Sequence, residues 1–232
     1  MTRLMSVALL VLLAASSSTS ADALSDRWTK FKAGSFVKIK TTAKLSGEEM
    51  VEESKFTLTE VTADFYALKI ETSMGGNALP VTDVKFPLTP SAAQDWTWEE
   101  KGISELELDG QKMKCSVRVA TSSDKKSLWT VWITEVGGAP LEVKSEKKLV
   151  VPGGSRTETS AVIKLSESVK IGEKEVACWV KTVVLEIEGQ KAESKVWESR
   201  DMPGLVVRSE QKTSSGALVM TTTREVVEFE VK

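Results

Sequence analysis

Few residues of this chain could carry out chemistry, and their types exclude the commonest mechanisms. The sequence of 232 residues contains no histidine, the most frequent general base, a frequent zinc ligand and the usual partner of a nucleophilic serine or cysteine. A Ser–Lys hydrolase needs its amine within hydrogen-bond reach of its hydroxyl, but residues three apart on a strand point to opposite faces. Five Ser-x-x-Lys pairs occur: Ser35/Lys38, Ser122/Lys125, Ser123/Lys126, Ser145/Lys148 and Ser209/Lys212. Those on strands fail this geometry, and with this many Ser and Lys residues chance is sufficient to produce such pairs. We therefore expect no catalytic residue and a protein that is not an enzyme.

Metal, cofactor and nucleic-acid sites also lack support. The acidic doublets Glu48-Glu49, Glu52-Glu53 and Glu99-Glu100 do not have the spacing of a calcium loop, and no glycine-rich phosphate loop joins a strand to a helix. The net charge is −2, with Lys and Glu interspersed, so no basic face for nucleic acid is visible. We expect no metal and no cofactor.

The seven tryptophans are the candidate binding residues. Trp96, Trp98 and Trp129 do not stand at the repeated tryptophan position of the internal repeat described below, and we interpret them as a ligand platform for a glycan or a lipid. Trp28, Trp132 and Trp197 recur at the same place in each repeat, which favours a structural role in capping a turn. The glycines Gly34 and Gly204 belong to the turns of the same repeat.

Two cysteines, Cys115 and Cys178, leave two interpretations open. In an oxidising compartment they could form one disulfide. Alternatively, they are two buried free thiols that behave as small apolar residues. The sequence does not decide between them, because a bridge requires Cα atoms within about 7 Å of each other.

The first residues indicate export. Arg3 is followed by an apolar run from Met5 to Ala15, and Ala21-Asp22-Ala23 is typical of a signal-peptide cleavage site. The run is shorter than the about 20 apolar residues of a transmembrane helix, although an uncleaved membrane anchor is the alternative. We predict cleavage after Ala23, a secreted or periplasmic protein, and no transmembrane segment in the mature chain.

The elements that must position these residues are strands. After a short entry at residues 24–32 that could be helical, the remainder of the single domain 24–232 alternates apolar and polar residues and is rich in Val and Thr. The expected strands are 36–40, 55–61, 65–70, 114–120, 128–133, 141–147, 176–188, 205–209 and 221–231. Turn signals such as Asp109-Gly110 separate them. The pattern predicts an all-β, antiparallel fold connected mostly by hairpins.

An internal repeat refines this prediction. Cys115 and Cys178 stand 63 residues apart in similar surroundings, and Val131-Trp132 matches Val196-Trp197 at an offset of 65. With a fainter copy near Trp28, the units are approximately 28–74, 102–166 and 167–232. Such units cannot bury an apolar face alone and must share a core. We predict one strongly curved antiparallel sheet or a half-open barrel, with a β-sandwich as the competitor, and residues 75–101 as a long connection or lid.

Two motifs carry a resemblance to known proteins. The start Trp28-x-x-Phe31-x-x-Gly34-Ser35 and the run from Trp197 to Gly204, Trp-x(5)-Pro-Gly, resemble uncharacterised secreted bacterial proteins that are all-β. The resemblance implies no known activity. In general shape the arrangement is also similar to the open-barrel lipoprotein carriers of the LolA kind.

Three classes of function remain. The first is a non-enzymatic protein that binds a partner protein or an envelope component through its curved sheet. The alternative is a carrier of an apolar ligand, a lipid or lipoprotein, in the concave face of a half-barrel, which a cavity lined by Leu, Val and Trp would favour. The third is an enzyme, which a cleft holding two convergent carboxylates with raised pKa would bring back into question.

Overall fold

The computed structural model describes residues 27–88, 96–151, 154–188, 190–215 and 218–232. The described residues form strands, turns and loops and no helix. The strands are β1 (Phe36–Leu45), β2 (Glu48–Val61), β3 (Phe65–Met74), β4 (Asn77–Ala78), β5 (Thr82–Pro87), β6 (Trp96–Leu108), β7 (Gln111–Ser122), β8 (Leu128–Val136), β9 (Ala139–Val151), β10 (Gly154–Ile171), β11 (Lys174–Ile187), β12 (Gln190–Glu198), β13 (Val206–Ser215) and β14 (Leu218–Glu230). The predicted signal peptide and its cleavage site lie outside the described residues. Within these ranges we find no helix that is long and apolar enough to cross a membrane.

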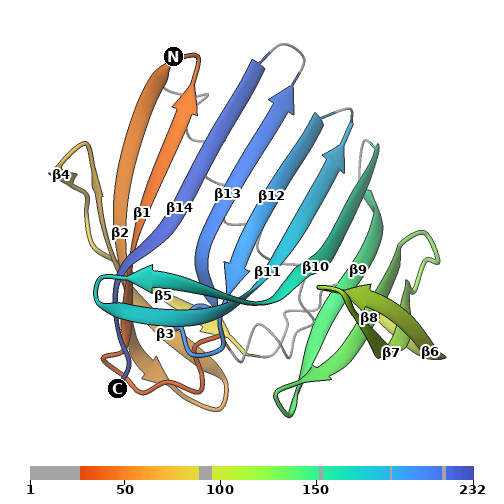
Figure 1. The fold of residues 1–232 in the computed structure, drawn as a ribbon. Coiled ribbons are helices and arrows are strands. Elements are labelled where there is room, and N and C mark those ends of the chain that lie inside the picture. Colours follow the sequence, from red (N-terminus) through yellow and green to blue (C-terminus); the bar gives the residue numbers. More distant parts are fainter. Residues whose placement is uncertain (1–26, 89–95, 152–153, 189, 216–217) are drawn as a thin grey trace.

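All of these strands belong to one antiparallel sheet, in which the first and last strands of the chain, β1 and β14, are neighbours away from either edge. The order is β4-β3-β2-β1-β14-β13-β12-β11-β10-β9-β8-β7-β6, and β5 pairs with β3 (Figure 1). The chain runs from β1 outward to one edge, resumes at the opposite edge with β6, and returns hairpin by hairpin to β14. The pairing of β1 with β14 therefore joins the two ends of the described chain.

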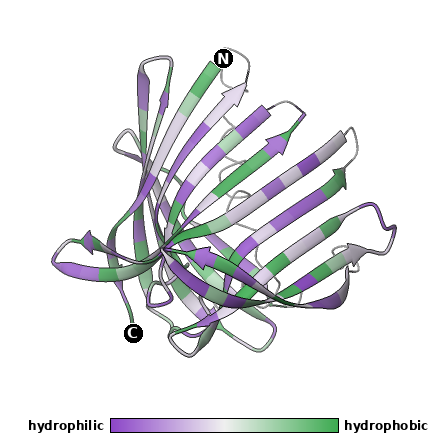
Figure 2. Cartoon of the chain, turned by 45° about the vertical axis from the view of Figure 1, so that its right-hand side comes forward, coloured by the Kyte–Doolittle hydropathy of each residue, from purple (hydrophilic) through white to green (hydrophobic). Residues whose placement is uncertain are grey.

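The sheet is strongly curved and is not closed into a barrel, as the sequence pattern predicted (Figures 1 and 2). The competing β-sandwich is wrong, because the strands form a single sheet rather than two. Figure 2 shows apolar and polar residues following one another along the strands, which is the alternation that places one set of side chains on each face. The right-handed twist of strands and several β-bulges account for the curvature.

Two bulges stand at matching places in the sequence repeat. The register between β8 and β9 shifts directly after Trp132, and the register between β12 and β13 shifts directly after Trp197. Each tryptophan stands opposite a cationic residue on the next strand, Lys144 in one case and Arg208 in the other. The two segments therefore have the same local geometry, as a repeat requires, while the boundaries of the repeat units stay a prediction.

The prediction of a long connection over residues 75–101 is wrong for its described part. Strands β4 and β5 fold back onto β3, and β6 begins at Trp96. Proline is tolerated in such an edge strand because its missing N–H faces away from the ladder, and Pro87 ends β5 opposite Phe65. Strands β6 and β12 were not among the expected strands, since their Ser, Thr and charged residues weaken the apolar alternation.

The expected helical entry is also wrong for residues 27–32. These residues form turns, in which the Phe31 N–H donates to the Trp28 carbonyl at 3.0 Å. Gly34 then takes a φ of +91°, a left-handed conformation that suits glycine. Trp28 and Phe31 are both buried in the largest core cluster, so packing rather than helix propensity fixes this segment.

That core cluster is closed by a bent hairpin. The tips of β10 and β11 cross over the sheet toward the lower ends of β14 and β1 (Figure 1). There the Lys174 ammonium donates to the Phe229 carbonyl at 3.4 Å and lies 4.5 Å from the centre of its ring. Register shifts between Val162 and Glu167 allow β10 to bend. The hairpin brings Ile171 and Val176 against the core residues of β1 and β14.

The two cysteines are buried free thiols that belong to different core clusters. Cys115 packs with Leu108 and Leu141, whereas Cys178 packs in the cluster that contains Val180. Of the two interpretations left open by the sequence, this structure has the free thiols.

Candidate binding site on the inner face of the sheet

The more buried face of the sheet, here called the inner face, carries a row of mostly small side chains at one level. Consecutive strand pairings place the members of this row directly opposite one another across seven strands, from β9 to β1. The row consists of Ser145, Ser160, Val183, Ser194, Gln211, Thr222 and Ala43. Their neighbours along each strand point to the other face, where Glu193, Lys212 and Thr221 are exposed.

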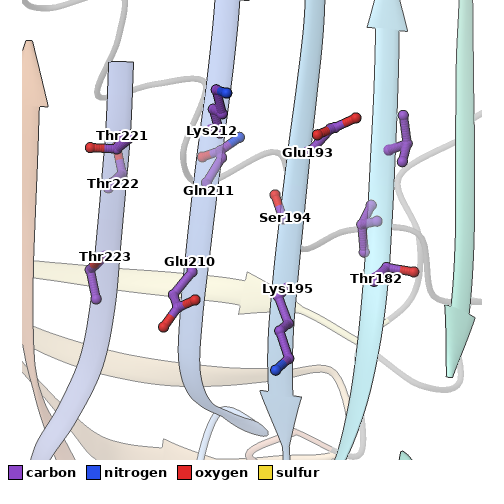
Figure 3. A pocket seen from close by; sticks show the side chains of 12 residues that line it. Thr182, Glu193, Ser194, Lys195, Glu210, Gln211, Lys212, Thr221, Thr222 and Thr223 are labelled. Atoms are coloured by element: carbon purple, nitrogen blue, oxygen red, sulfur yellow. The ribbon is translucent and has the colours of Figure 1, made fainter. Parts of the chain in front are cut away.

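An open cavity of about 650 Å³ lies over four of these strands and is called the trough below. Figure 3 shows its lining on β11, β12, β13 and β14. Ten of its twelve lining residues carry hydroxyl, amide or charged groups: Thr182, Glu193, Ser194, Lys195, Glu210, Gln211, Lys212, Thr221, Thr222 and Thr223. The other two are Val183 and Val184. The volume is within the range of small-ligand pockets, roughly 300–1,000 Å³.

The structure brings Trp96, Trp98 and Trp129 together at the β6 edge of the inner face. The ring centres of Trp98 and Trp129 are 5.3 Å apart, and those of Trp96 and Trp129 are 6.2 Å apart. Both separations are within the range of favourable aromatic contacts, about 4.5–7 Å. Trp129 is only 5% exposed, whereas Trp98 is 43% exposed. The cluster therefore combines a buried packing residue with an aromatic surface that solvent reaches.

Charged residues that sequence reasoning missed continue this cluster. Lys147 stands opposite both Trp129 and Glu158, and its ammonium lies 4.3 Å from the Trp129 ring centre. Burial lowers the pKa of Lys147, although the Glu158 carboxylate partly offsets this effect. Glu158 is 5% exposed and forms an ion pair with Arg156 at 2.9 Å, yet its Oε1 has no hydrogen-bond partner. A sequence signal existed, because Lys147 continues the two-residue spacing of Leu141, Val143 and Ser145.

A second cleft of about 180 Å³ lies between β9, β10, β11 and β12. Glu142 and Glu198 both line it. Burial raises the pKa of Glu142 to about 7, and the nearby carboxylates of Glu198 and Glu158 add to the increase. Glu198 accepts a hydrogen bond from Trp179 Nε1 at 3.0 Å and pairs with Lys181 at 2.8 Å.

The sequence analysis named two convergent carboxylates as the feature that would reopen an enzymatic interpretation. Here both oxygens of Glu198 are already engaged, one by Lys181 and one by Trp179. Glu142 is then the one lining carboxyl group whose oxygens are not held by a cation or an indole. General acid–base chemistry on two carboxylates needs both groups to act on the substrate, so this arrangement gives it little support.

The three tryptophans of the repeat lie away from the Trp96 cluster. Trp28 packs against the turn at Gly204, which has a φ of +80°. Trp197 is buried and donates to Glu167 Oε1 at 2.7 Å, and Trp132 is half-buried beside Lys144. These contacts are consistent with the structural role that the repeat predicts. Among the described residues, no group of His, Cys, Asp and Glu could hold a metal ion.

Comparisons with known proteins find no family and only distant structural likenesses. No protein-family model and no curated protein matches the sequence. A solved structure from Bacteroides fragilis, described as an exported protein with a YmcC-like fold, matches 86% of this chain and 97% of its own, with 9% identity and a TM-score of 0.39. The hypothetical lipoprotein YmcC from Escherichia coli matches 91% and 100%, with 11% identity and a TM-score of 0.28. A DUF1329 family protein from Desulfovibrio piger matches 87% of each chain, with 9% identity and a TM-score of 0.31. At these values we draw nothing about function from the likenesses, and the motif and LolA resemblances stay predictions.

Proposed function

We propose that this chain is an exported, non-enzymatic protein that binds a partner protein or an envelope component along the inner face of its curved sheet. The export signal predicted in residues 1–23 supports the location. The trough supports the mode of binding, because it is an open depression over four strands rather than an enclosed pocket. The side chains of Ser194 and Thr222 are small, so the trough leaves room for a ligand above them.

The composition of the trough favours this function over the carrier of an apolar ligand. A carrier would be supported by a cavity lined with Leu, Val and Trp. Of the twelve lining residues, those whose side chains belong to the inner-face row are Val183, Ser194, Gln211 and Thr222, and only Val183 is aliphatic. Burying hydroxyl and amide groups against an aliphatic chain costs free energy unless each group finds a hydrogen-bond partner. A ligand with polar groups of its own avoids that cost.

The Trp96, Trp98 and Trp129 cluster supplies an aromatic anchor at one end of the inner face. Rigid aromatic side chains dominate binding energy at many interfaces. Trp98 is exposed enough to contact a ligand, while Trp129 holds it in place from below. The proposed binding surface therefore extends from this cluster along the row of small residues to the trough.

A photo-crosslinking amino acid introduced at Ser194 tests this proposal. Lys191 is the matched control, because it lies on β12, is exposed, does not line the trough, and stands three residues from Ser194, so that its side chain points to the other face. The variants are made in cells that export the protein, and the products are analysed by mass spectrometry. We expect a discrete, saturable product from position 194 and none from position 191. Equal labelling at both positions, or none at either, would contradict an inner-face binding surface.

A further inference from the structure

Arg224 on β14 differs from the other arginines of the described residues. Arg118 and Arg156 form ion pairs with glutamates on the sheet, and Arg208 pairs with Glu210. Arg200 donates to the Pro140 carbonyl, and Arg27 also has interaction partners. No hydrogen bond and no ion pair is found for the Arg224 guanidinium within the described part of the chain, although burial lowers its pKa.

The charge that faces Arg224 stands two strands away. Arg224 is opposite Thr41 on β1, and Thr41 is in turn opposite Glu52 on β2. Adjacent strands are about 4.8 Å apart, so the two backbone positions are separated by about 10 Å. Glu52 raises the pKa of Arg224 through space, but the two groups do not come within the 4.0 Å of an ion pair. Glu52 Oε1 accepts from Ser54 at 2.9 Å, while its buried Oε2 has no hydrogen-bond partner.

Thr222 supplies a third unsatisfied group beside them. It precedes Arg224 by two residues on the same face of β14 and lines the trough. Thr222 is 3% exposed, and its hydroxyl oxygen has no hydrogen-bond partner in the structure. Buried polar groups are nearly always hydrogen-bonded, so two buried atoms without a partner, Glu52 Oε2 and Thr222 Oγ1, beside an unpaired Arg224 call for an explanation.

The charges of this cluster indicate what would satisfy it. A purely anionic ligand would pair with Arg224 but would leave Glu52 unpaired and repelled. A neutral glycan or an aliphatic chain would desolvate both charges without replacing either of them. A ligand that carries a negative and a positive group close together would satisfy both. Side chains two residues apart on an extended polypeptide lie on the same side, about 7 Å apart, and the long Arg and Glu side chains can close the remaining difference.

We propose that Arg224 and Glu52 form a docking site for an extended polypeptide segment of a partner protein, in which an acidic side chain pairs with Arg224 and a basic one with Glu52. This inference rests on the proposed function and names the class of partner. Thr222 hydrogen-bonds the backbone of the segment where it enters the trough. Charge-assisted hydrogen bonds are stronger than neutral ones, so the pair of charges contributes most of the specificity.

Binding of defined peptides to the mature protein tests the proposal. The probe is a fluorescent Ser/Gly peptide with one Asp and one Lys two positions apart. The comparison peptides replace Lys with Ser, Asp with Ser, or both. We expect the peptide with both charges to bind at least about tenfold more tightly than the uncharged one, and its affinity to fall as salt concentration rises. Equal affinity for all peptides, or tighter binding of a neutral oligosaccharide or of phospholipid vesicles measured in parallel, would overturn the proposal.

Two variants localise the effect. Arg224→Met should reduce affinity for the doubly charged peptide by about tenfold and leave the uncharged peptide unaffected. Arg118→Met is the matched control, because Arg118 lies on the same face but is already paired with Glu100 at 2.7 Å, and it should change neither affinity. Circular dichroism establishes that both variants are folded. If a crosslink at Ser194 persists with unchanged yield in Arg224→Met, the inner-face function stands and the charged docking site is wrong.

Discussion

Lys181 Nζ lies 2.8 Å from Glu198 Oε1, and the two side chains are only 14% and 4% exposed. They stand on the neighbouring strands β11 and β12, and the indole of Trp179 donates to the second carboxylate oxygen. The glutamate thus has a charged and a neutral donor in a cleft that water hardly reaches. Removing one partner of such a pair leaves a buried charge without compensation, which is far more costly than losing an exposed pair.

Substituting Lys181 with methionine should therefore destabilise the protein strongly. We expect Lys181→Met to lower the free energy of unfolding by about 3–5 kcal/mol, measured by urea denaturation. The control is Lys44→Met, which removes an exposed ion pair with Glu49 whose side chains are 62% and 51% exposed. That variant should keep the denaturation midpoint of the original protein. Similar losses in the two variants would show that the buried geometry is not as described.

Glu142 makes stability depend on pH. Its pKa is raised from 4.5 to about 7 in the folded protein, so ionising it costs more in the folded chain than in the unfolded one. Its contribution to stability is fully present below pH 4.5 and is lost as pH rises through 7. A difference of this size corresponds to about 3 kcal/mol.

The variant Glu142→Gln should remove this contribution. Measured by urea denaturation at several pH values, the stability of Glu142→Gln relative to the original protein should rise by about 3 kcal/mol between acidic and neutral pH. Glu146→Gln, which changes an exposed carboxylate on the same strand, should give a profile parallel to that of the original protein. A parallel profile for Glu142→Gln as well would refute the raised pKa.

The two thiols should be unreactive until the protein unfolds. Cys115 and Cys178 are 0% and 2% exposed, and burial raises the pKa of both thiols, that of Cys178 to about 12. The thiolate is the reactive form. A thiol reagent added without reductant should label neither cysteine in the native protein and both in concentrated urea. Failure to label either one after unfolding would point instead to the disulfide that the sequence left open.

Substitutions in the cluster of Trp96, Trp98 and Trp129 should distinguish a residue that packs in the core from one that is available to a ligand. Trp129→Ala should cost about 3–5 kcal/mol of stability, because it empties a buried site, while Trp98→Ala should cost much less since that side chain is 43% exposed. Thermal unfolding followed by circular dichroism measures both. Trp98→Ala then provides a folded variant in which the aromatic anchor alone is removed. Equal losses would mean that Trp98 is part of the core and not of a ligand surface.

Local patterns in the sequence were sufficient to predict the all-β fold class. The spacing of Leu141, Val143 and Ser145 predicts a strand with one buried face, because side chains alternate between faces whatever the strand pairs with. Edge strands are harder to predict, as β5 shows, since they pair on one side and accept Pro87. The strand β10 could be inferred from the repeat, as a Thr-rich strand that returns after a glycine hairpin, but not from its own alternation: much of its sequence is Ser, Thr and Glu, and its bulges interrupt the pattern.

The amino-acid composition also excluded the commonest catalytic and metal-binding sites. The absence of histidine and of metal-binding motifs was readable directly, and the tryptophans Trp96, Trp98 and Trp129 could be selected as a group because they do not stand at the repeated tryptophan position. Their mutual contact could not be predicted, because Trp129 meets the other two only when β6, β7 and β8 pair in one particular register.

The same dependence on register explains why Lys147, Glu158, Arg224 and Glu52 had no visible role before the structure was known. Arg224 and Glu52 are far apart in the chain and become neighbours through the pairing of β14 with β1 and of β1 with β2. A shift of one residue in either pairing would turn one of the charges to the opposite face. Alternation along a strand is a local property of the backbone, whereas register is fixed by burial and turns across the whole sheet, and that is where the binding face is formed.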